Sequence, residues 1–141
     1  GITLIEMLIV IAIIGIISAI GIPGYIGQQR RAARTEASSN LMNLRLLEEQ
    51  FSAENGVYAP TAAPLSRDYL GTVAVDNGIE DILPGFRPGT ETDLNYTYRI
   101  TVPAANSTTF IATAIAKSGK RVAGDADCLI DQNNVRSGPC W

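Results

Sequence analysis

The order of hydrophobic and polar positions divides the chain into four stretches. Residues 1–27 are apolar almost throughout, and Glu6 is the only charged residue among the first 29 positions. Because ~20 apolar residues span the ~30 Å hydrocarbon layer of a bilayer, this stretch predicts a transmembrane helix. In residues 28–53, apolar side chains recur at three-, four- and seven-residue spacings. We therefore expect the same helix to continue into water as an amphipathic helix.

The amphipathic stretch predicts one face that packs on a folded domain. That face is expected to consist of these side chains: Ala33, Ala37, Leu41, Leu44 and Phe51. Arg45, Glu48 and Glu49 are expected on the other faces of the helix. The transmembrane and amphipathic parts together predict one helix of ~50 residues, about 75 Å long at 1.5 Å per residue.

A loop region follows the predicted helix. The pair Asn55-Gly56 and the later Pro60 predict where the helix ends. Residues 54–94 contain several prolines and glycines, which predicts little regular structure beyond one helical turn near residues 67–70.

The last stretch, residues 95–141, predicts an antiparallel sheet. Apolar and polar residues alternate with a period of two from residue 95 to residue 102. A turn is expected at residues 103–106, a second strand at 108–116 and a short third strand at 128–131. One face of this sheet can pack on the apolar face of the helix, so the predicted fold class is α+β.

Composition narrows the possible functions. The chain has 141 residues, a formal net charge of −3 and no histidine. The mild negative charge argues against a protein that coats nucleic acid. Histidine is the commonest general base and metal ligand, and the sequence contains neither a nucleophile–base pair nor a phosphate-binding glycine loop. We therefore expect that the protein is not an enzyme and binds neither a cofactor nor a small-molecule substrate.

Two cysteines lie near the C-terminus. Cys128 and Cys140 are compatible with reactive thiols, with part of a metal site or with a disulfide. Two thiols without histidine make a poor zinc site, which requires four nitrogen or sulfur ligands. A disulfide is the favoured interpretation, and it implies an oxidising compartment outside the cytoplasm.

The apolar stretch contains residues that weaken a helix. Gly15 and Gly21 lower helix propensity, and Pro23 removes a backbone hydrogen bond. Two compatible interpretations follow: close packing against other helices, or a segment where the helix can kink or locally melt.

Glu6 is the charged residue of the same stretch, and its burial in a membrane costs free energy. A carboxylate at the centre of a membrane helix costs on the order of 2.5–3.5 kcal/mol, and less near the interface. A charge in such a segment is therefore a functional-site hypothesis that requires a partner.

The N-terminus carries a resemblance to a known family. Residues 2–23, which begin Ile-Thr-Leu-Ile-Glu, closely resemble the start of type IV pilins and of type II secretion pseudopilins. The resemblance implies that a prepilin peptidase cuts after Gly1 and methylates the amine of Ile2, although the family usually has Phe or Met there. It also implies that Glu6 attracts the N-terminal amine of a neighbouring subunit; pairing of Glu6 with its own N-terminus at the polar interface stays open as the alternative.

The resemblance extends to the whole plan of the chain. It implies a type IV pilin fold, in which the long helix packs on a small antiparallel sheet and a C-terminal loop is closed by Cys128 and Cys140. The implied function is a structural subunit of a helical homo-oligomeric filament used for adhesion, surface motility or DNA uptake. The subunit would wait in the bacterial inner membrane until the pilus assembly machinery adds it to an extracellular filament.

Several alternatives stay open. The first is a pseudopilin, whose family tends to bind calcium. Oxygen ligands are available from Asp125, Asp127 and Asp131, but Leu129 interrupts the pattern of a calcium loop. A membrane-anchored binding protein is a further alternative. Nucleic acid as a partner also stays open, since arginines cluster at residues 30–34 while the net charge is negative.

A filament that conducts electrons through aromatic side chains is the last alternative. Tyr25, Phe51 and Tyr58 lie on or near the predicted helix. Aromatic residues at helical spacing serve packing more often than electron transfer.

Overall fold

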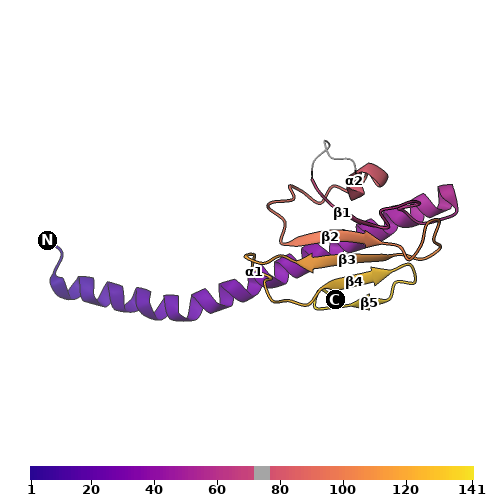
Figure 1. Cartoon of the computed structure of the whole chain (residues 1–141). Coiled ribbons are helices and arrows are strands. Elements are labelled where there is room, and N and C mark those ends of the chain that lie inside the picture. Colours follow the sequence, from indigo (N-terminus) through magenta and orange to yellow (C-terminus); the bar gives the residue numbers. More distant parts are fainter. Residues whose placement is uncertain (72–76) are drawn as a thin grey trace. The chain divides into compact units, whose positions relative to one another are not determined.

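The computed structural model describes residues 1–71 and 77–141. The chain divides into two compact units, Gly1–Ala32 and Ala33–Trp141. Helix α1, Leu4–Asn55, contributes its first part to the first unit and the rest to the second (Figure 1). Its 52 residues confirm the prediction of one long helix. Helix α1 ends where Asn55-Gly56 predicts, and Gly56 has a positive φ of 78° that favours glycine.

The second unit contains a five-stranded antiparallel sheet. The strands are β1 Ser66–Asp68, β2 Tyr96–Thr101, β3 Ile111–Ala116, β4 Cys128–Asp131 and β5 Arg136–Ser137. They lie side by side in sequence order, from β1 at one edge to β5 at the other. The antiparallel sheet confirms the predicted fold class, although β3 begins three residues later than predicted, at Ile111 rather than at residue 108.

Two local predictions at the edges of the sheet differ from the structure. The helical turn predicted near residues 67–70 is wrong, because β1 pairs there with β2 in the register Arg67↔Ile100. An ion pair fixes this edge strand: Arg99 Nε and Nη2 lie 2.6 and 2.9 Å from the two carboxylate oxygens of Asp68. The short helix α2, Ile79–Ile82, and strand β5 were not predicted.

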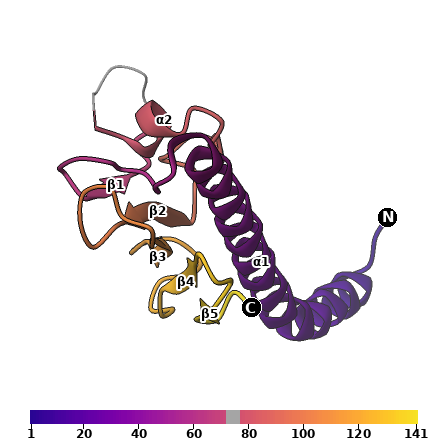
Figure 2. The same ribbon diagram turned by 90° about the vertical axis from the view of Figure 1, so that its right-hand side faces the viewer.

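The core lies between one face of the sheet and the second part of α1 (Figure 2). Strand β2 alternates between buried and half-buried residues, and Tyr96, Tyr98 and Ile100 point into the core. The predicted helix face is confirmed by these buried or partly buried side chains: Ala33, Ala37, Leu41, Leu44 and Phe51. The Tyr98 hydroxyl accepts a hydrogen bond of 2.8 Å from Asn40 Nδ2, so its polar end is satisfied.

The position of Glu48 on α1 differs from the prediction. Glu48 was expected away from the packing face of the helix, but its side chain is fully buried. Glu48 follows Leu44 by four residues and Leu41 by seven, so the helix period places it on the buried face despite its charge. Its Oε2 accepts a hydrogen bond of 2.9 Å from the Ala59 N–H, while Oε1 has no partner among the described residues.

The environment of Glu48 favours its neutral form. Burial raises the pKa of its carboxyl to about 8, the charge of Glu49 adds to the rise, and the Ala59 hydrogen bond opposes it. The group is therefore mostly protonated at neutral pH, which avoids the cost of an unpaired charge in the core.

The predicted disulfide is confirmed. Cys128 in β4 is bonded to Cys140, across a separation of 12 residues. The bond holds the C-terminal segment against the sheet. Gly138 permits this close approach: it has a φ of 100°, and a Cβ there would lie 2.3 Å from the Asp127 carbonyl oxygen.

Candidate assembly surface

The first unit exposes apolar side chains on every side. Each large hydrophobic side chain between residues 2 and 26 has at least 47% of its surface exposed. By length and composition, α1 is able to cross a membrane. A helix that is apolar all round is stable when lipid or other helices surround it. This surface therefore requires an environment that the single chain does not supply.

Glu6 and Thr3 form a capping box at the start of α1. The Thr3 N–H and hydroxyl donate hydrogen bonds of 3.0 and 2.8 Å to Glu6 Oε2, and the Glu6 N–H lies 3.3 Å from the Thr3 hydroxyl oxygen. These reciprocal bonds satisfy backbone donors that the first helical turn leaves open. Sequence reasoning missed this role, although Thr-x-x-Glu before an apolar run is its signature.

The capping box uses only one oxygen of Glu6. Among the described residues, Oε1 has no hydrogen-bond partner, and the Gly1 amine is not a partner of the carboxylate. A surface hollow of about 350 Å³ lies beside the carboxylate. It is lined by Ile2, Glu6, Met7, Ile9 and Val10. Glu6 can therefore cap its own helix and still offer an oxygen to an incoming cation.

The helix-weakening residues lie in an unbroken stretch of α1. The α-helix continues through Gly15, Gly21 and Pro23. A Cβ added at Gly15 or Gly21 would meet no atom within 4 Å. Packing within the chain therefore gives no reason for glycine at these positions. Close packing against a neighbour and local melting both stay predictions about an assembled state.

Two of the three aspartates that could supply calcium ligands, Asp125 and Asp131, bond to other groups of the chain. Arg34 Nε and Nη2 each lie 2.9 Å from an oxygen of Asp125, and this pair raises the pKa of the guanidinium. Asp131 Oδ1 accepts hydrogen bonds from the backbone N–H groups of Asn133 and Val135 at 2.9 and 2.8 Å. In residues 1–71 and 77–141, no three acidic or cysteine side chains gather in a way that could hold a metal ion.

The aromatic residues of the second unit form core contacts. Tyr58 packs on Phe110 with ring centroids 4.7 Å apart, and Phe86 contacts Tyr69 and Tyr98 at 5.5 Å. The contact with Phe110 shows that Tyr58 is a packing residue.

Comparison with known proteins identifies the family. The sequence model of the family described as "Type IV minor pilin ComP, DNA uptake sequence receptor" matches residues 23–130. The chain belongs to this family of type IV pilins. The match includes the second part of α1 and the strands β1 to β3, so it covers the packed sheet as well as the helix.

Individual relatives agree with this family. The pilin is 45% identical to the type IV major pilin protein PilA of Myxococcus xanthus over 62 residues, which are 44% of this chain and 28% of PilA. It is 45% identical to the prepilin peptidase-dependent protein D of Escherichia coli over 90 residues, 56% of this chain and 59% of that protein.

A secretion protein is also similar. The type II secretion system core protein G of Aeromonas hydrophila is 30% identical over 81 residues, 49% of this chain and 57% of the relative. The chain thus spans from about a quarter to three fifths of the length of these relatives. No solved structure gives a significant match.

Proposed function

We propose that this pilin is a structural subunit of an extracellular type IV pilus. The subunits would polymerise through the first part of α1, which lies in the unit Gly1–Ala32. The observation that carries the proposal is the helix surface between residues 2 and 26, which is apolar on every side and exposed. It is joined to a packed, disulfide-bonded unit suited to an oxidising exterior. Before assembly, this helix would hold the subunit in the inner membrane.

Assembly would exchange lipid for neighbouring helices around the same surface. The apolar side chains stay out of water in both environments, so the hydrophobic effect does not prevent extraction from the membrane. Gly15 and Gly21 leave room for close approach of neighbours, and residues 15–23 would unwind where the filament requires it.

Glu6 would set the axial register of each new subunit. We expect a prepilin peptidase to cut after Gly1, so that the methylated amine of Ile2 becomes the cation that meets the free oxygen of Glu6 in a neighbour. An ammonium and a carboxylate each lose hydration in the apolar core, and only their pairing recovers much of that free energy. A subunit in the wrong register leaves both charges unpaired.

A pseudopilin role is the main alternative, because one relative is a type II secretion core protein. We do not propose the DNA-receptor role after which the matching family is named. The net charge of this chain is −3, and Arg34 and Arg99 lie in ion pairs with aspartates, which lowers the positive charge available to phosphates.

Sheared surface fibres test the proposal. Cells that express the pilin together with a pilus assembly system should release filaments that contain this chain. Mass spectrometry of the filament subunit should find a methylated Ile2 terminus. If a reference pilin assembles in the same cells while this chain stays in the membrane fraction, the proposal is wrong. Fibres that appear only with a type II secretion system would establish the pseudopilin role instead.

A further inference from the structure

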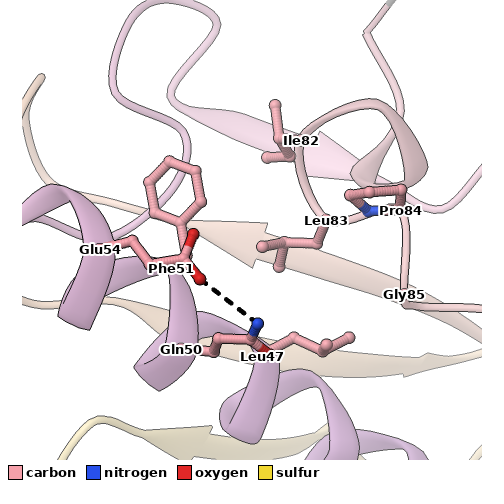
Figure 3. Close-up of a pocket in the computed structure, with 8 residues that line it drawn as sticks. All are labelled: Leu47, Gln50, Phe51, Glu54, Ile82, Leu83, Pro84 and Gly85. Carbon is pink, nitrogen blue, oxygen red and sulfur yellow. Dashed lines mark hydrogen bonds between the residues drawn. The ribbon is translucent and has the colours of Figure 1, made fainter.

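The charged residues of α1 lie in an order that the stability of the helix itself does not explain. Its first cationic side chains, Arg30 and Arg31, lie near the middle of the helix, whereas its last turn contains Glu54 and no basic residue. Figure 3 shows Glu54 beside a groove of about 270 Å³ at the end of α1, with the 3.4 Å hydrogen bond that Gln50 Nε2 donates to its Oε1. The helix dipole favours cations in the last turn. The position of the two arginines therefore requires another reason.

The two arginines lie directly beyond the apolar stretch. No charged residue lies between Glu6 and Arg30, which follows Glu6 by 24 residues, and both arginines belong to the unit Gly1–Ala32. At 1.5 Å per residue, about 36 Å of helix separates Glu6 from Arg30. The hydrocarbon layer of a bilayer is ~30 Å thick, and the headgroup regions extend it to ~40–45 Å. A helix that spans the bilayer therefore brings Arg30 and Arg31 to the headgroups of one leaflet when Glu6 lies near the other interface.

A guanidinium group suits the phosphate of a lipid headgroup. It is planar and offers five N–H donors, two of which can bind one phosphate at the same time. A contact with another residue of the chain thus leaves donors for a lipid. Arg31 is exposed and Arg30 is half-buried. The aliphatic stem of an arginine can lie along apolar surface while its charged end reaches the phosphate.

Arg34, one turn after Arg30, has a different role. Its Nε and Nη2 both donate to the carboxylate of Asp125, whose side chain is only 4% exposed. This ion pair lies within the second unit and fixes Arg34 to the segment that precedes β4. The arginine cluster therefore consists of two residues for the membrane surface and one that stabilises the fold.

Charge decides which lipids the pair prefers. In a zwitterionic phospholipid, a cationic group of the same headgroup balances the phosphate, whereas an anionic phospholipid such as phosphatidylglycerol keeps a net negative charge. An arginine near an anionic membrane surface gains an attraction that corresponds to about five-fold in binding. Arg30 and Arg31 should therefore select anionic lipids.

We propose that Arg30 and Arg31 bind the phosphates of anionic phospholipids at the outer surface of the inner membrane while the subunit waits for assembly. The inference rests on the proposed function, in which the second unit lies outside the cytoplasm. The contacts would fix the depth of the helix, because deeper insertion would pull both guanidinium groups into hydrocarbon. Glu6 is then held near the inner interface, where a carboxylate costs less than at the bilayer centre. Addition to a filament has to break these lipid contacts.

The lipid preference of the isolated subunit tests the proposal. The full chain is placed in phosphatidylcholine vesicles with a trace of spin-labelled phosphatidylglycerol or spin-labelled phosphatidylcholine, and electron paramagnetic resonance gives the fraction of each label bound to the protein. Phosphatidylglycerol should associate about five-fold more strongly with the unmodified chain, and R30Q/R31Q should lower this ratio to about one. An equal ratio for the variant and the unmodified chain would overturn the proposal.

K120Q/R121Q is the matched control. It removes the same number of positive charges, but from the segment between β3 and β4, and it should keep the preference for phosphatidylglycerol. Loss of the preference in K120Q/R121Q as well would show that net charge selects the lipid and that the arginine pair does not. Near-ultraviolet circular dichroism of R30Q/R31Q should match the unmodified chain, because both substitutions lie outside the packed unit.

Inorganic phosphate separates a lipid site from a site for free anions. It should reduce the preference no more than chloride does at equal ionic strength, because screening is then its only effect. A larger loss with phosphate would show that the arginines bind a free anion and would overturn the assignment to lipid. Recovery of the chain outside the vesicles would overturn the membrane stage of the proposed function, whereas a chain that inserts without lipid preference contradicts this inference alone.

Discussion

The two parts of helix α1 are stabilised in different ways. Between residues 2 and 26 the helix exposes all of its large apolar side chains. From Ala33 to Glu48 it buries one face completely against the sheet. Contacts within the chain account for the apolar face of the second part. The apolar surface of the first part has no partner within the described chain and requires lipid or other subunits to cover it. Stability of the fold and competence for assembly should therefore respond to separate sets of substitutions.

Glu6 gives the largest expected effect on the assembly part. Glu6→Ala should reduce filament yield by a hundred-fold or more, because each incoming ammonium would then be buried without a counterion, at a cost of several kcal/mol. The variant should remain in the membrane with an unchanged melting temperature of the second unit. Fibre counts by electron microscopy and fractionation measure both.

Glu6→Gln separates charge from capping. Glutamine can retain the capping box with Thr3, since Gln also serves at this position, but it lacks the negative charge. It should therefore assemble as poorly as Glu6→Ala. Normal filaments from Glu6→Gln would show that the carboxylate is needed for its cap and not for an ammonium partner.

Leu44 and Leu46 give the largest expected contrast within the packed part. Leu44 is fully buried, whereas Leu46, two residues later on the same helix, is 68% exposed. Leu44→Ala should lower the free energy of unfolding by about 2–5 kcal/mol through lost burial and the cavity left behind. Leu46→Ala should stay within about 0.5 kcal/mol of the unmodified protein.

Denaturant unfolding of the full chain in detergent measures this contrast, with near-ultraviolet circular dichroism reporting on the packed tyrosines. Leu8→Ala in the first part is a second control, because its side chain makes no core contact. Equal losses from Leu44→Ala and Leu46→Ala would mean that the sheet does not stabilise this face of α1.

Glu48 predicts a pH dependence confined to the packed part. Its carboxyl has a pKa of about 8 in the folded chain, against 4.5 as the ordinary value. Stability from this group is full below about pH 4.5 and is lost as the pH rises through about 8, because the unfolded chain then releases a proton that the folded chain retains.

Glu48→Gln should remove that dependence. Between about pH 5 and about pH 9, the unmodified protein should lose on the order of 2–3 kcal/mol more than the variant. Unfolding curves at several pH values measure the difference, and parallel pH profiles of the two proteins would show that Glu48 is not the titrating group.

The sequence predicted what depends on long-range patterns and missed what depends on single contacts. The apolar run and the alternation from residue 95 to residue 102 each extend over many residues, and the two cysteines leave one possible disulfide. The structure confirms the helix, the sheet and the disulfide. Strand β1 is only three residues long and exists because it pairs with β2, a contact that no local pattern contains.

The two glutamates show the same limit at the level of side chains. Glu48 lies on the helix period of the buried face, but as a charged residue it was placed on another face of the helix. The position of the Ala59 N–H, which donates to its carboxyl, shows why burial is tolerated. For Glu6 the sequence did contain the signal, since Thr-x-x-Glu marks a capping box.

Thr3 gives the smallest expected effect and tests the division of roles at Glu6. Thr3→Ala removes the hydroxyl that bonds to Glu6 Oε2 at 2.8 Å and accepts from the Glu6 N–H. Loss of such a cap costs about 1 kcal/mol, which should speed amide exchange in the first turn of α1 about five-fold in detergent. Filament yield should change little, because Glu6 Oε1 stays available to an incoming amine while the backbone N–H of residue 3 still donates to Oε2. Thr3→Ser keeps the hydroxyl and should match the unmodified protein in both measurements. If Thr3→Ala instead stops assembly as completely as Glu6→Ala, the capping box is part of the assembly contact and not only a local support of the helix end.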